Sequence, residues 1–201
     1  MLALICCIII IRKWSGSVRF TVDNTVAIAI DFQDRILPAM SNKEELKENV
    51  IKLLKGFKVL NVPVIFSQQY TKGLGMTDTD IIEAYTSVED FSYYDKVSFS
   101  CYDDEQIREA LNRTGCDNII VFGIEAHVCM LQTVIDLLDS DRYNVIVVTD
   151  CSDSRKVTDK EIAYRRLEQE GAFLSTYESM LFELTGAAGT DTFKAISKIV
   201  K

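Results

Sequence analysis

Three side chains that lie far apart in this sequence have the chemistry of a hydrolytic site: Asp31, Lys96 and Cys129. A cysteine thiol has an ordinary pKa of about 8.5 and is mostly protonated at neutral pH. A neighbouring lysine and the start of a helix each favour the thiolate, which is the nucleophilic form. An aspartate within reach can take the thiol proton and later return it to a leaving amine. Together the three residues indicate nucleophilic catalysis that needs no histidine.

Each of these residues also has a plain structural interpretation. A cysteine in an amphipathic helix usually belongs to the core. Asp31 can cap the turn after a strand, and a lysine after a loop is usually solvated. The combination carries the prediction, because each residue stands at the end of a predicted strand or in the turn that follows one.

The elements that must position these residues alternate along the chain. Apolar runs predict strands, and amphipathic runs with a period of 3.6 residues predict helices. Capping boxes at Ser41 with Glu44 and at Thr158 with Glu161 predict two helix starts. Continuous Val and Ile runs are typical of strands buried on both faces of a parallel sheet. We therefore expect one three-layer α/β/α domain. Its strands are predicted at residues 25–32, 64–67, 96–99, 118–123, 144–149 and 172–176, and its helices at 103–113, 126–138, 158–170, 178–184 and 192–200, with a further helix behind Ser41.

In such sheets the active site lies beyond the carboxyl ends of the strands. Asp31 ends the first predicted strand, and Lys96 opens the third. The strand that ends at Gly123 leads to Cys129 in the first turn of the next helix. Backbone N–H groups around Glu125 to Cys129 can form an oxyanion hole, worth about 3 kcal/mol per donor.

The chain has a single histidine, His127, and this count excludes several classes of site. A zinc site with several histidine ligands is impossible. A Ser-His-Asp triad would have to use His127, and no G-x-S-x-G elbow is present. The P-loop pattern and G-x-G-x-x-G are absent too, so nothing marks a phosphate or dinucleotide cradle. We expect no metal and no cofactor.

Composition limits the partners. The 201 residues are 48% hydrophobic and 26% charged, with a net charge of −8. Such an acidic chain has no general attraction for nucleic acid or anionic membranes, so a small-molecule substrate is expected. The six cysteines form no C-x-x-C pair. Their spacing fits neither a zinc ribbon nor a disulfide framework, which favours a reducing, cytoplasmic compartment.

The amino-terminal segment is apolar from Met1 to Ile11 and is followed by Arg12 and Lys13. A membrane span needs about 20 apolar residues, so this run is too short for stable insertion. A signal peptide carries its positive charge before the apolar run, not after it. A peripheral anchor and an added strand or partner contact remain open. We favour an extension over residues 1–18 and a working domain over 19–201.

Five stretches of the sequence resemble the isochorismatase-like cysteine hydrolase family, from about Phe20 to the C-terminus. They read AIAIDFQDRILPAM, SQQYTKGLG, KVSFS, VFGIEAHVCMLQTVIDLL and VVTDCSDSR. The chain is most similar to the isochorismatase-domain-containing proteins of unassigned substrate. The resemblance implies a Rossmann-like parallel sheet of about six strands and, for many members, an oligomer.

Site roles follow from the resemblance residue by residue. Asp31 matches the family's general base, Lys96 its lysine and Cys129 its nucleophile. A cis peptide bond is implied between Ile124 and Glu125, with the amides of Glu125 and Cys129 facing the developing oxyanion. Nicotinamidases of the family bind a metal through an aspartate and two histidines, which a chain with one histidine cannot reproduce.

Supporting residues follow the same strand ends. Gln33, Gln69, Tyr70 and Phe99 are candidates for substrate binding, although each can equally be a packing or solvated residue. His127 lies two positions before Cys129, and such positions do not face each other on a helix. A contact outside the catalytic group is therefore expected for His127. Arg155 is expected to structure its turn or to hold a carboxylate of a partner subunit.

The leading hypothesis is a hydrolase of a small amide-like substrate, which acts on non-peptide C–N bonds through a covalent acyl-enzyme on Cys129. A second is a non-covalent vinyl-ether hydrolase of the isochorismatase type that uses Asp31 and Lys96. A third is a small-molecule-binding protein without turnover.

Overall fold

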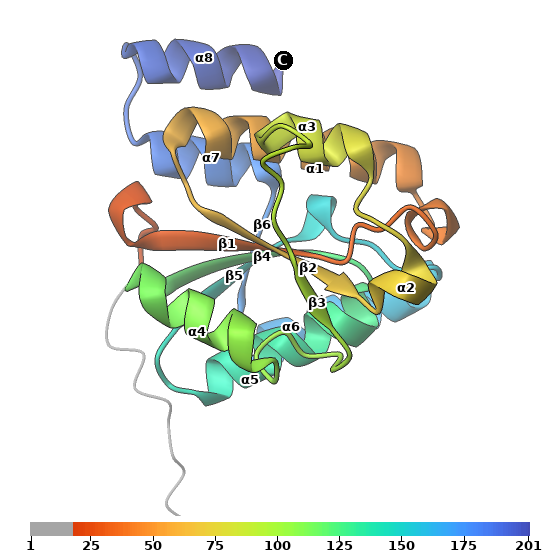
Figure 1. The fold of residues 1–201 in the computed structure, drawn as a ribbon. Coiled ribbons are helices and arrows are strands. Elements are labelled where there is room, and N and C mark those ends of the chain that lie inside the picture. The colour runs from red at the N-terminus through yellow and green to blue at the C-terminus, as the bar shows by residue number, and fades with distance from the viewer. Residues whose placement is uncertain (1–17) are drawn as a thin grey trace, which may run out of the picture.

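The protein is described by a computed structural model over residues 18–201, and the amino-terminal apolar run lies outside the described residues. Its centre is a six-stranded sheet in the order β3-β2-β1-β4-β5-β6, with every pair parallel (Figure 1). The strands are β1 (Thr25–Ile30), β2 (Val64–Gln69), β3 (Tyr94–Lys96), β4 (Asn118–Gly123), β5 (Asn144–Val148) and β6 (Phe173–Ser175). The predicted three-layer α/β fold is confirmed.

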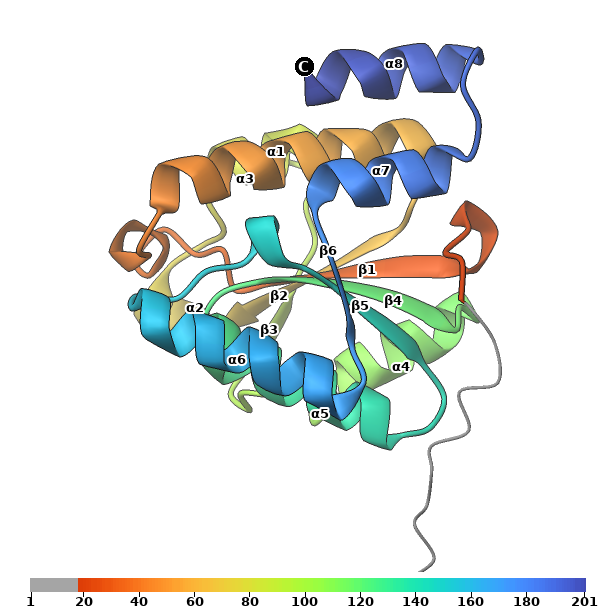
Figure 2. The same ribbon diagram turned by 180° about the vertical axis from the view of Figure 1, so that it is seen from behind.

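Helices cover both faces of the sheet (Figures 1 and 2). On one face lie α1 (Lys43–Leu60), α3 (Thr79–Tyr85) and α7 (Tyr177–Thr185), with α8 (Asp191–Val200) outside α1 and α7. On the other lie α4 (Glu105–Thr114), α5 (Leu131–Asp139) and α6 (Val157–Glu170). The short α2 (Thr71–Leu74) follows β2. Both central strands, β1 and β4, are buried along their whole length, which explains their unbroken apolar sequences.

The sheet separates two apolar cores. Phe57 and Phe122 pack in the core under α1 and α7, and Ile107 and Val134 pack in the core under α4 and α5. Alternate residues of β1 face opposite sides, so Ala27 belongs to the first core and Ile28 to the second. This two-sided burial fixes the register of β1 against β2 and β4. The register in turn determines where the carboxyl ends of the three strands lie relative to one another.

The strand order also locates the site. Successive connections move outwards from β1 to β2 and β3, then return across β1 to β4 and continue to β5 and β6. The order therefore reverses between β1 and β4, and ligands of such sheets bind at the carboxyl edge of this crevice. Asp31 directly follows β1, and the turn that carries Cys129 directly follows β4.

Several local predictions are wrong. Lys96 ends β3 instead of opening a strand, because β3 pairs with β2 over residues 94–96 only. Neither capping box forms: α1 begins after Asn42 and α6 after Lys156, each without a side-chain cap. The Ser41 hydroxyl instead donates to Asp153 Oδ1 at 2.7 Å. A long-range carboxylate acceptor thus replaces the local cap.

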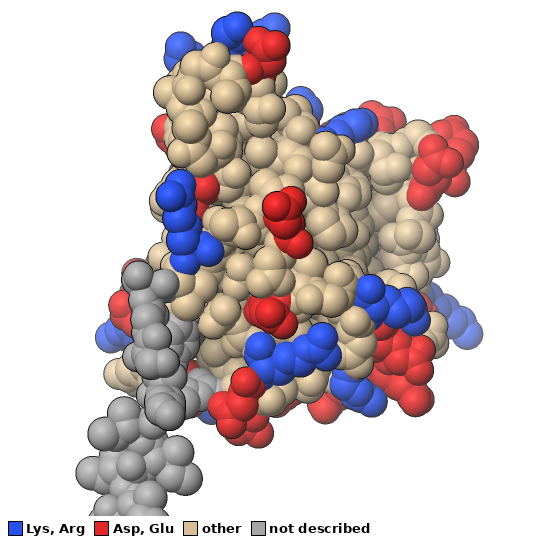
Figure 3. All heavy atoms as spheres, turned by 90° about the vertical axis from the view of Figure 1, so that its left-hand side faces the viewer, with Lys and Arg blue, Asp and Glu red and all other residues tan. Residues whose placement is uncertain are grey.

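The surface carries mixed charge. On the face shown in Figure 3, lysine and arginine side chains lie dispersed among aspartates and glutamates instead of gathering in one basic area. Across residues 18–201, no helix combines the length and the apolar character needed to cross a membrane.

A close approach at Gly123 yields a first prediction. Gly123 ends β4 with φ of +151°, and a Cβ there would lie 2.5 Å from the Ile30 carbonyl oxygen of β1. Gly123→Ala should therefore lower the free energy of unfolding by about 3 kcal/mol or more, through strain and overpacking. Urea unfolding followed by circular dichroism measures this loss.

Gly115→Ala is the matched control. Gly115 also has a positive φ, of +70°, but no atom lies within 4 Å of the position that an added Cβ would take. Its loss should stay near 1 kcal/mol, roughly the ordinary cost of a left-handed alanine. Equal losses in the two variants would contradict the close contact between β1 and β4.

Candidate active site

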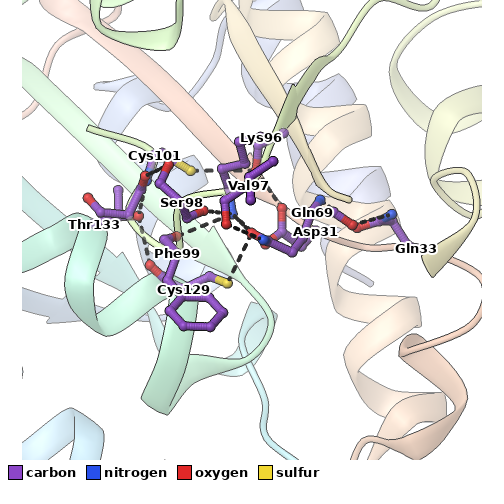
Figure 4. A network of polar contacts seen from close by, with 12 residues as sticks. Asp31, Gln33, Gln69, Lys96, Val97, Ser98, Phe99, Cys101, Cys129 and Thr133 are labelled. Atoms are coloured by element: carbon purple, nitrogen blue, oxygen red, sulfur yellow. Dashed lines mark hydrogen bonds and ion pairs between the residues drawn. The ribbon is translucent and has the colours of Figure 1, made fainter. Parts of the chain in front are cut away.

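A buried ion pair joins the ends of β1 and β3. Lys96 Nζ lies 2.9 Å from Asp31 Oδ2, and the two residues are only 1% and 2% exposed. Asp31 adopts a left-handed conformation, with φ of 59°, in the turn immediately after β1. This turn directs its carboxylate toward Lys96 (Figure 4). The structure thus brings the predicted acid and lysine into direct contact.

The pair is surrounded by further polar groups. Ser67 Oγ of β2 donates to Asp31 Oδ1 at 2.7 Å. Lys96 Nζ also donates to Gln69 Oε1 at 2.6 Å and to the carbonyls of Phe99 and Ser98 at 3.2 and 3.4 Å. Burial lowers the pKa of Lys96, but the charge and hydrogen bond of Asp31 together with the electrostatic contributions of Cys101 and Cys129 outweigh it and hold that pKa above its ordinary value. Lys96 is therefore a cation at neutral pH.

Cys129 lies beside this pair on the turn after β4. Residues Ala126–Met130 form one π-helical turn that leads directly into α5. Cys129 Sγ is 3.9 Å from Gln69 Oε1, the same oxygen that accepts from Lys96 (Figure 4). Thr133 donates to the Cys129 carbonyl at 2.7 Å and supports the turn from α5. The acid, the lysine and the thiol therefore form one cluster.

The resting thiol differs from the sequence-based expectation. Burial raises the pKa of Cys129 far above its ordinary value, and the nearby Asp31 carboxylate raises it further. Lys96 lowers the same pKa, but its charge is already balanced by Asp31. Cys129 is consequently a protonated thiol at neutral pH, where the sequence had suggested a stabilised thiolate.

The backbone beside Cys129 has an unusual path. The peptide bond between Ile124 and Glu125 is cis, at the position that the family resemblance implies. The Ala126 amide donates to the Asp153 carbonyl, and the amides of Val128 and Met130 donate to the Glu125 carbonyl. The amides of Ala126, Val128 and Met130 are thus engaged within the protein. The amides of Glu125 and Cys129 remain the predicted oxyanion-hole donors.

Arg155 anchors the same segment from within the chain. Its Nε lies 2.9 Å from Glu125 Oε2, and its backbone amide donates to the same oxygen at 3.1 Å. Burial raises the pKa of Glu125, but the hydrogen bonds and charge of Arg155 prevail and keep it below its ordinary value. The structural interpretation of Arg155 is thus the one that the geometry supports.

The four predicted substrate-binding residues occupy different places. Gln69 belongs to the cluster of Asp31, Lys96 and Cys129. Gln33 is fully buried, and its amide bonds the backbone of Gln69 and of Gly75, so it braces the site. Tyr70 and Phe99 are 54% and 53% exposed and flank Gln69 and Lys96 along the chain.

His127 and the residues that sequence reasoning missed complete the site. His127 Nδ1 contacts Ser154 Oγ at 2.9 Å and is not part of the hydrogen-bonded cluster of Asp31, Lys96 and Cys129. Ser67 was missed, although it ends the predicted second strand and the carboxyl-end rule applied to it. Cys101 was also missed, and its thiol donates to Ser67 Oγ at 3.5 Å. Nothing in the local sequence marks that contact.

Metal-binding side chains do not gather in the described part of the chain. Within residues 18–201, His, Cys, Asp and Glu side chains form no group of three or more arranged to hold a metal ion. Lys96 occupies the space beside Asp31 instead. The residues around the thiol are thus those of an acid, a cation and amide groups.

Comparison with known proteins identifies the family of this chain. Residues 25–179 match the isochorismatase domain. Isochorismatase domain-containing protein 2 of Xenopus laevis is 33% identical over 88% of this chain and 83% of its own length. The chain belongs to the isochorismatase family, whose hydrolase fold it shares.

Two solved structures show the same fold. A structure described as the MAR1 ribonuclease of Caenorhabditis elegans is 32% identical, with a TM-score of 0.83 over 91% of this chain and 92% of its own. The YcaC product of Escherichia coli, described as an octameric hydrolase of unknown specificity, is 22% identical. Its TM-score is 0.84 over 92% of this chain and 90% of its own.

The buried ion pair yields a second prediction. Lys96→Met leaves the Asp31 carboxylate buried without its counter-charge, so the variant should lose about 3–5 kcal/mol of stability at pH 7. Asp31→Asn combined with Lys96→Met removes both charges and should be more stable than Lys96→Met alone. Urea unfolding of the wild type and both variants measures the difference. A double variant less stable than Lys96→Met would rule out a stranded carboxylate as the cause.

Proposed function

We propose that this protein hydrolyses a small amide-like substrate by nucleophilic attack of Cys129 through a covalent acyl-enzyme. The supporting observation is the single buried cluster of an aspartate, a lysine and a thiol, linked through Gln69 Oε1. Such a cluster contains a nucleophile, a proton acceptor and a fixed cation, which are the groups that acyl transfer requires.

In the first half-reaction, Asp31 takes the thiol proton as Cys129 Sγ bonds to the substrate carbonyl carbon. The raised pKa of Cys129 means that proton transfer accompanies attack and does not precede it. Lys96 Nζ, 2.9 Å from Asp31 Oδ2, places a fixed positive charge beside the carboxylate that accepts the proton. The negative charge then passes to the substrate oxygen, where the amides of Glu125 and Cys129 stabilise it.

Acylation is completed when Asp31 returns the proton to the leaving amine as the C–N bond breaks. A thioester on Cys129 remains. Water then attacks this thioester while Asp31 accepts a water proton, and collapse releases a carboxylic acid and restores the thiol. This route uses side chains and backbone only, and it requires no cofactor.

The substrate is proposed to be small because the reacting groups are deeply placed. Asp31, Lys96 and Cys129 are at most 6% exposed, so only a compact group can reach them. Tyr70 and Phe99 are proposed as apolar walls at the outer part of the site, and Gln69 as its polar contact. Gln33 contributes by bracing the Gln69 backbone.

The alternatives make different demands on Cys129. Vinyl-ether hydrolysis needs an acid such as Asp31 with Lys96, but no nucleophile. A binding protein needs neither. The amide hydrolase is preferred because Cys129 is oriented toward the cluster through Gln69 and its turn is supported by Thr133.

Cleavage of RNA, which the description of the nematode structure raises, has less support here. The chain has a net charge of −8, whereas RNA-binding proteins concentrate positive charge to engage phosphates. Its only histidine is engaged with Ser154.

Replacing Cys129 gives the third prediction. Cys129→Ala should reduce hydrolysis of a responsive small amide about a thousandfold or more, because the nucleophile is lost. Ammonia or amine release across a panel of small amides measures turnover, and intact mass spectrometry detects the acyl adduct. Cys116→Ala is the control, since Cys116 is a buried cysteine whose thiol hydrogen-bonds the Thr114 carbonyl instead of the Asp31–Lys96 pair.

The same panel separates the three functions. Activity retained in Cys129→Ala but lost in Asp31→Asn would indicate the non-covalent route. A ligand that binds without adduct or turnover would indicate a binding protein.

We also propose that the protein is a homo-oligomer of the reducing cytoplasm. The four cysteines among the described residues are free thiols, and the Escherichia coli structure is described as octameric. Light scattering coupled to size exclusion should give a mass that is a multiple of 22.7 kDa. A monomer across the micromolar range would contradict the assembly without affecting the proposed chemistry.

A further inference from the structure

The Lys96 ammonium has more acceptors than protons. Four oxygens surround it, from Asp31, Gln69, Ser98 and Phe99. An ammonium has three N–H groups. Every proton is therefore engaged in the resting site, and the Cys129 sulfur can receive one only if an acceptor withdraws.

Among these acceptors, Gln69 is the one suited to withdraw. Asp31 is buried, charged and held by Ser67. The Ser98 and Phe99 oxygens belong to the backbone. The Gln69 oxygen, by contrast, is on a partly exposed side chain whose Nε2 donates to the carbonyl of Val97, a residue 81% exposed. Rotation of this side chain toward the outside gives up its hydrogen bond to the Val97 carbonyl but breaks no strand pairing.

The backbone of Gln69 stays in place during such a rotation. The buried Gln33 amide accepts from the Gln69 N–H at 2.7 Å and donates to the Gln69 carbonyl at 3.1 Å. Gln33 thereby braces the end of β2 on both polar groups of one residue. The freedom that remains is in the Gln69 side chain itself.

The position of Gln69 Oε1 opposes ionisation of the thiol. The oxygen is 2.6 Å from Lys96 Nζ and 3.9 Å from Cys129 Sγ. A thiol can donate its proton to this oxygen, whereas a thiolate is repelled by the oxygen's partial negative charge. The same oxygen also draws a Lys96 proton away from the sulfur. Both effects favour the protonated form of Cys129.

We propose that Gln69 is a positioning residue that keeps Cys129 in its resting thiol form by holding Lys96, and that its displacement makes a Lys96 N–H available to the sulfur. The proposal rests on the proposed function, because it assigns Gln69 a role in controlling the same nucleophile. No bond is formed or broken in this step. One hydrogen bond from Lys96 changes its acceptor, the Gln69 hydrogen bond to the Val97 carbonyl breaks, and the thiol loses the oxygen that accepted its proton.

Other charged and titratable groups also face the sulfur and remain in place. Asp31 at the end of β1 opposes ionisation, Lys96 on β3 favours it, and Cys101 before α4 opposes it. His127 on the same turn is directed to Ser154 and Asp159. A substitution at Gln69 alters none of these residues, so its effect on the thiol reports the Gln69 contact.

Two substitutions at Gln69 change the contact in opposite directions. Gln69→Met has nearly the same shape but lacks the amide oxygen, so it releases a Lys96 N–H. Gln69→Glu has the same shape and adds negative charge beside the sulfur. The experiment follows the rate of Cys129 alkylation by iodoacetamide from about pH 6 to 10, with the modified peptide quantified by mass spectrometry. This range lies below the raised pKa of the thiol, so the rate rises with pH throughout.

The rate-against-pH curve of Gln69→Met should move about one pH unit lower, which is a tenfold faster reaction at a given pH. The curve of Gln69→Glu should move to higher pH. Gln68→Met is the matched control: Gln68 is the buried neighbour on β2, and its amide contacts Thr77 and Thr71 instead of Lys96. Its curve should coincide with that of the wild type.

Shifts in the same direction for both Gln69 variants, or curves that match the Gln68→Met control, would overturn the proposal. The alkylation assay does not require the substrate, so its failure is separate from failure of the proposed function. Opposite shifts together with undiminished hydrolysis in Cys129→Ala would retain the role of Gln69 and reject the covalent mechanism. Loss of hydrolysis in Cys129→Ala without the opposite shifts would retain the covalent mechanism and reject the role of Gln69.

Discussion

The buried contact between Asp31 and Lys96 is the constraint on which the rest of the site depends. A carboxylate and an ammonium removed from water are costly unless they are paired and their remaining hydrogen-bonding groups are satisfied. Here Ser67 donates a hydrogen bond to Asp31, while Gln69 and two backbone carbonyls after β3 accept hydrogen bonds from Lys96. The ends of three adjacent strands are consequently tied to one another by the same charges that the proposed chemistry uses.

This constraint explains why the thiol is held as it is. Lys96 would favour a thiolate on its own, but the field of a neutralised pair is weak and burial penalises a further charge. The π-helical turn brings Cys129 close to the pair without placing a second anion there at rest. A site of this kind stays unreactive until a substrate supplies an electrophilic carbon and an oxygen that can take the negative charge.

The fold could be predicted from the sequence more completely than the site. Unbroken apolar strands such as β1 and β4 reveal a parallel sheet, and the carboxyl-end rule directs attention to Asp31 and to the turn before Cys129. The start of β3 could not be predicted, because a three-residue edge strand has no period of its own and is defined by its pairing with β2. The contacts of Cys101 with Ser67, and of Ser41 with Asp153, join residues 34 and 112 positions apart, so local patterns do not contain them.

The wide sequence separation of the site residues has a consequence for the nascent, unfolded chain. Asp31 and Lys96 are 65 positions apart, and Gln69 and Cys129 are 60 apart. Long-range strand pairings of this kind form late, because loop closure is unfavourable until several strands meet. During synthesis Cys129 is therefore hydrated and has the pKa of a free thiol, about 8.5. Oxidants and electrophiles can thus attack the nascent chain at Cys129 more readily than the finished protein, and folding protects the residue.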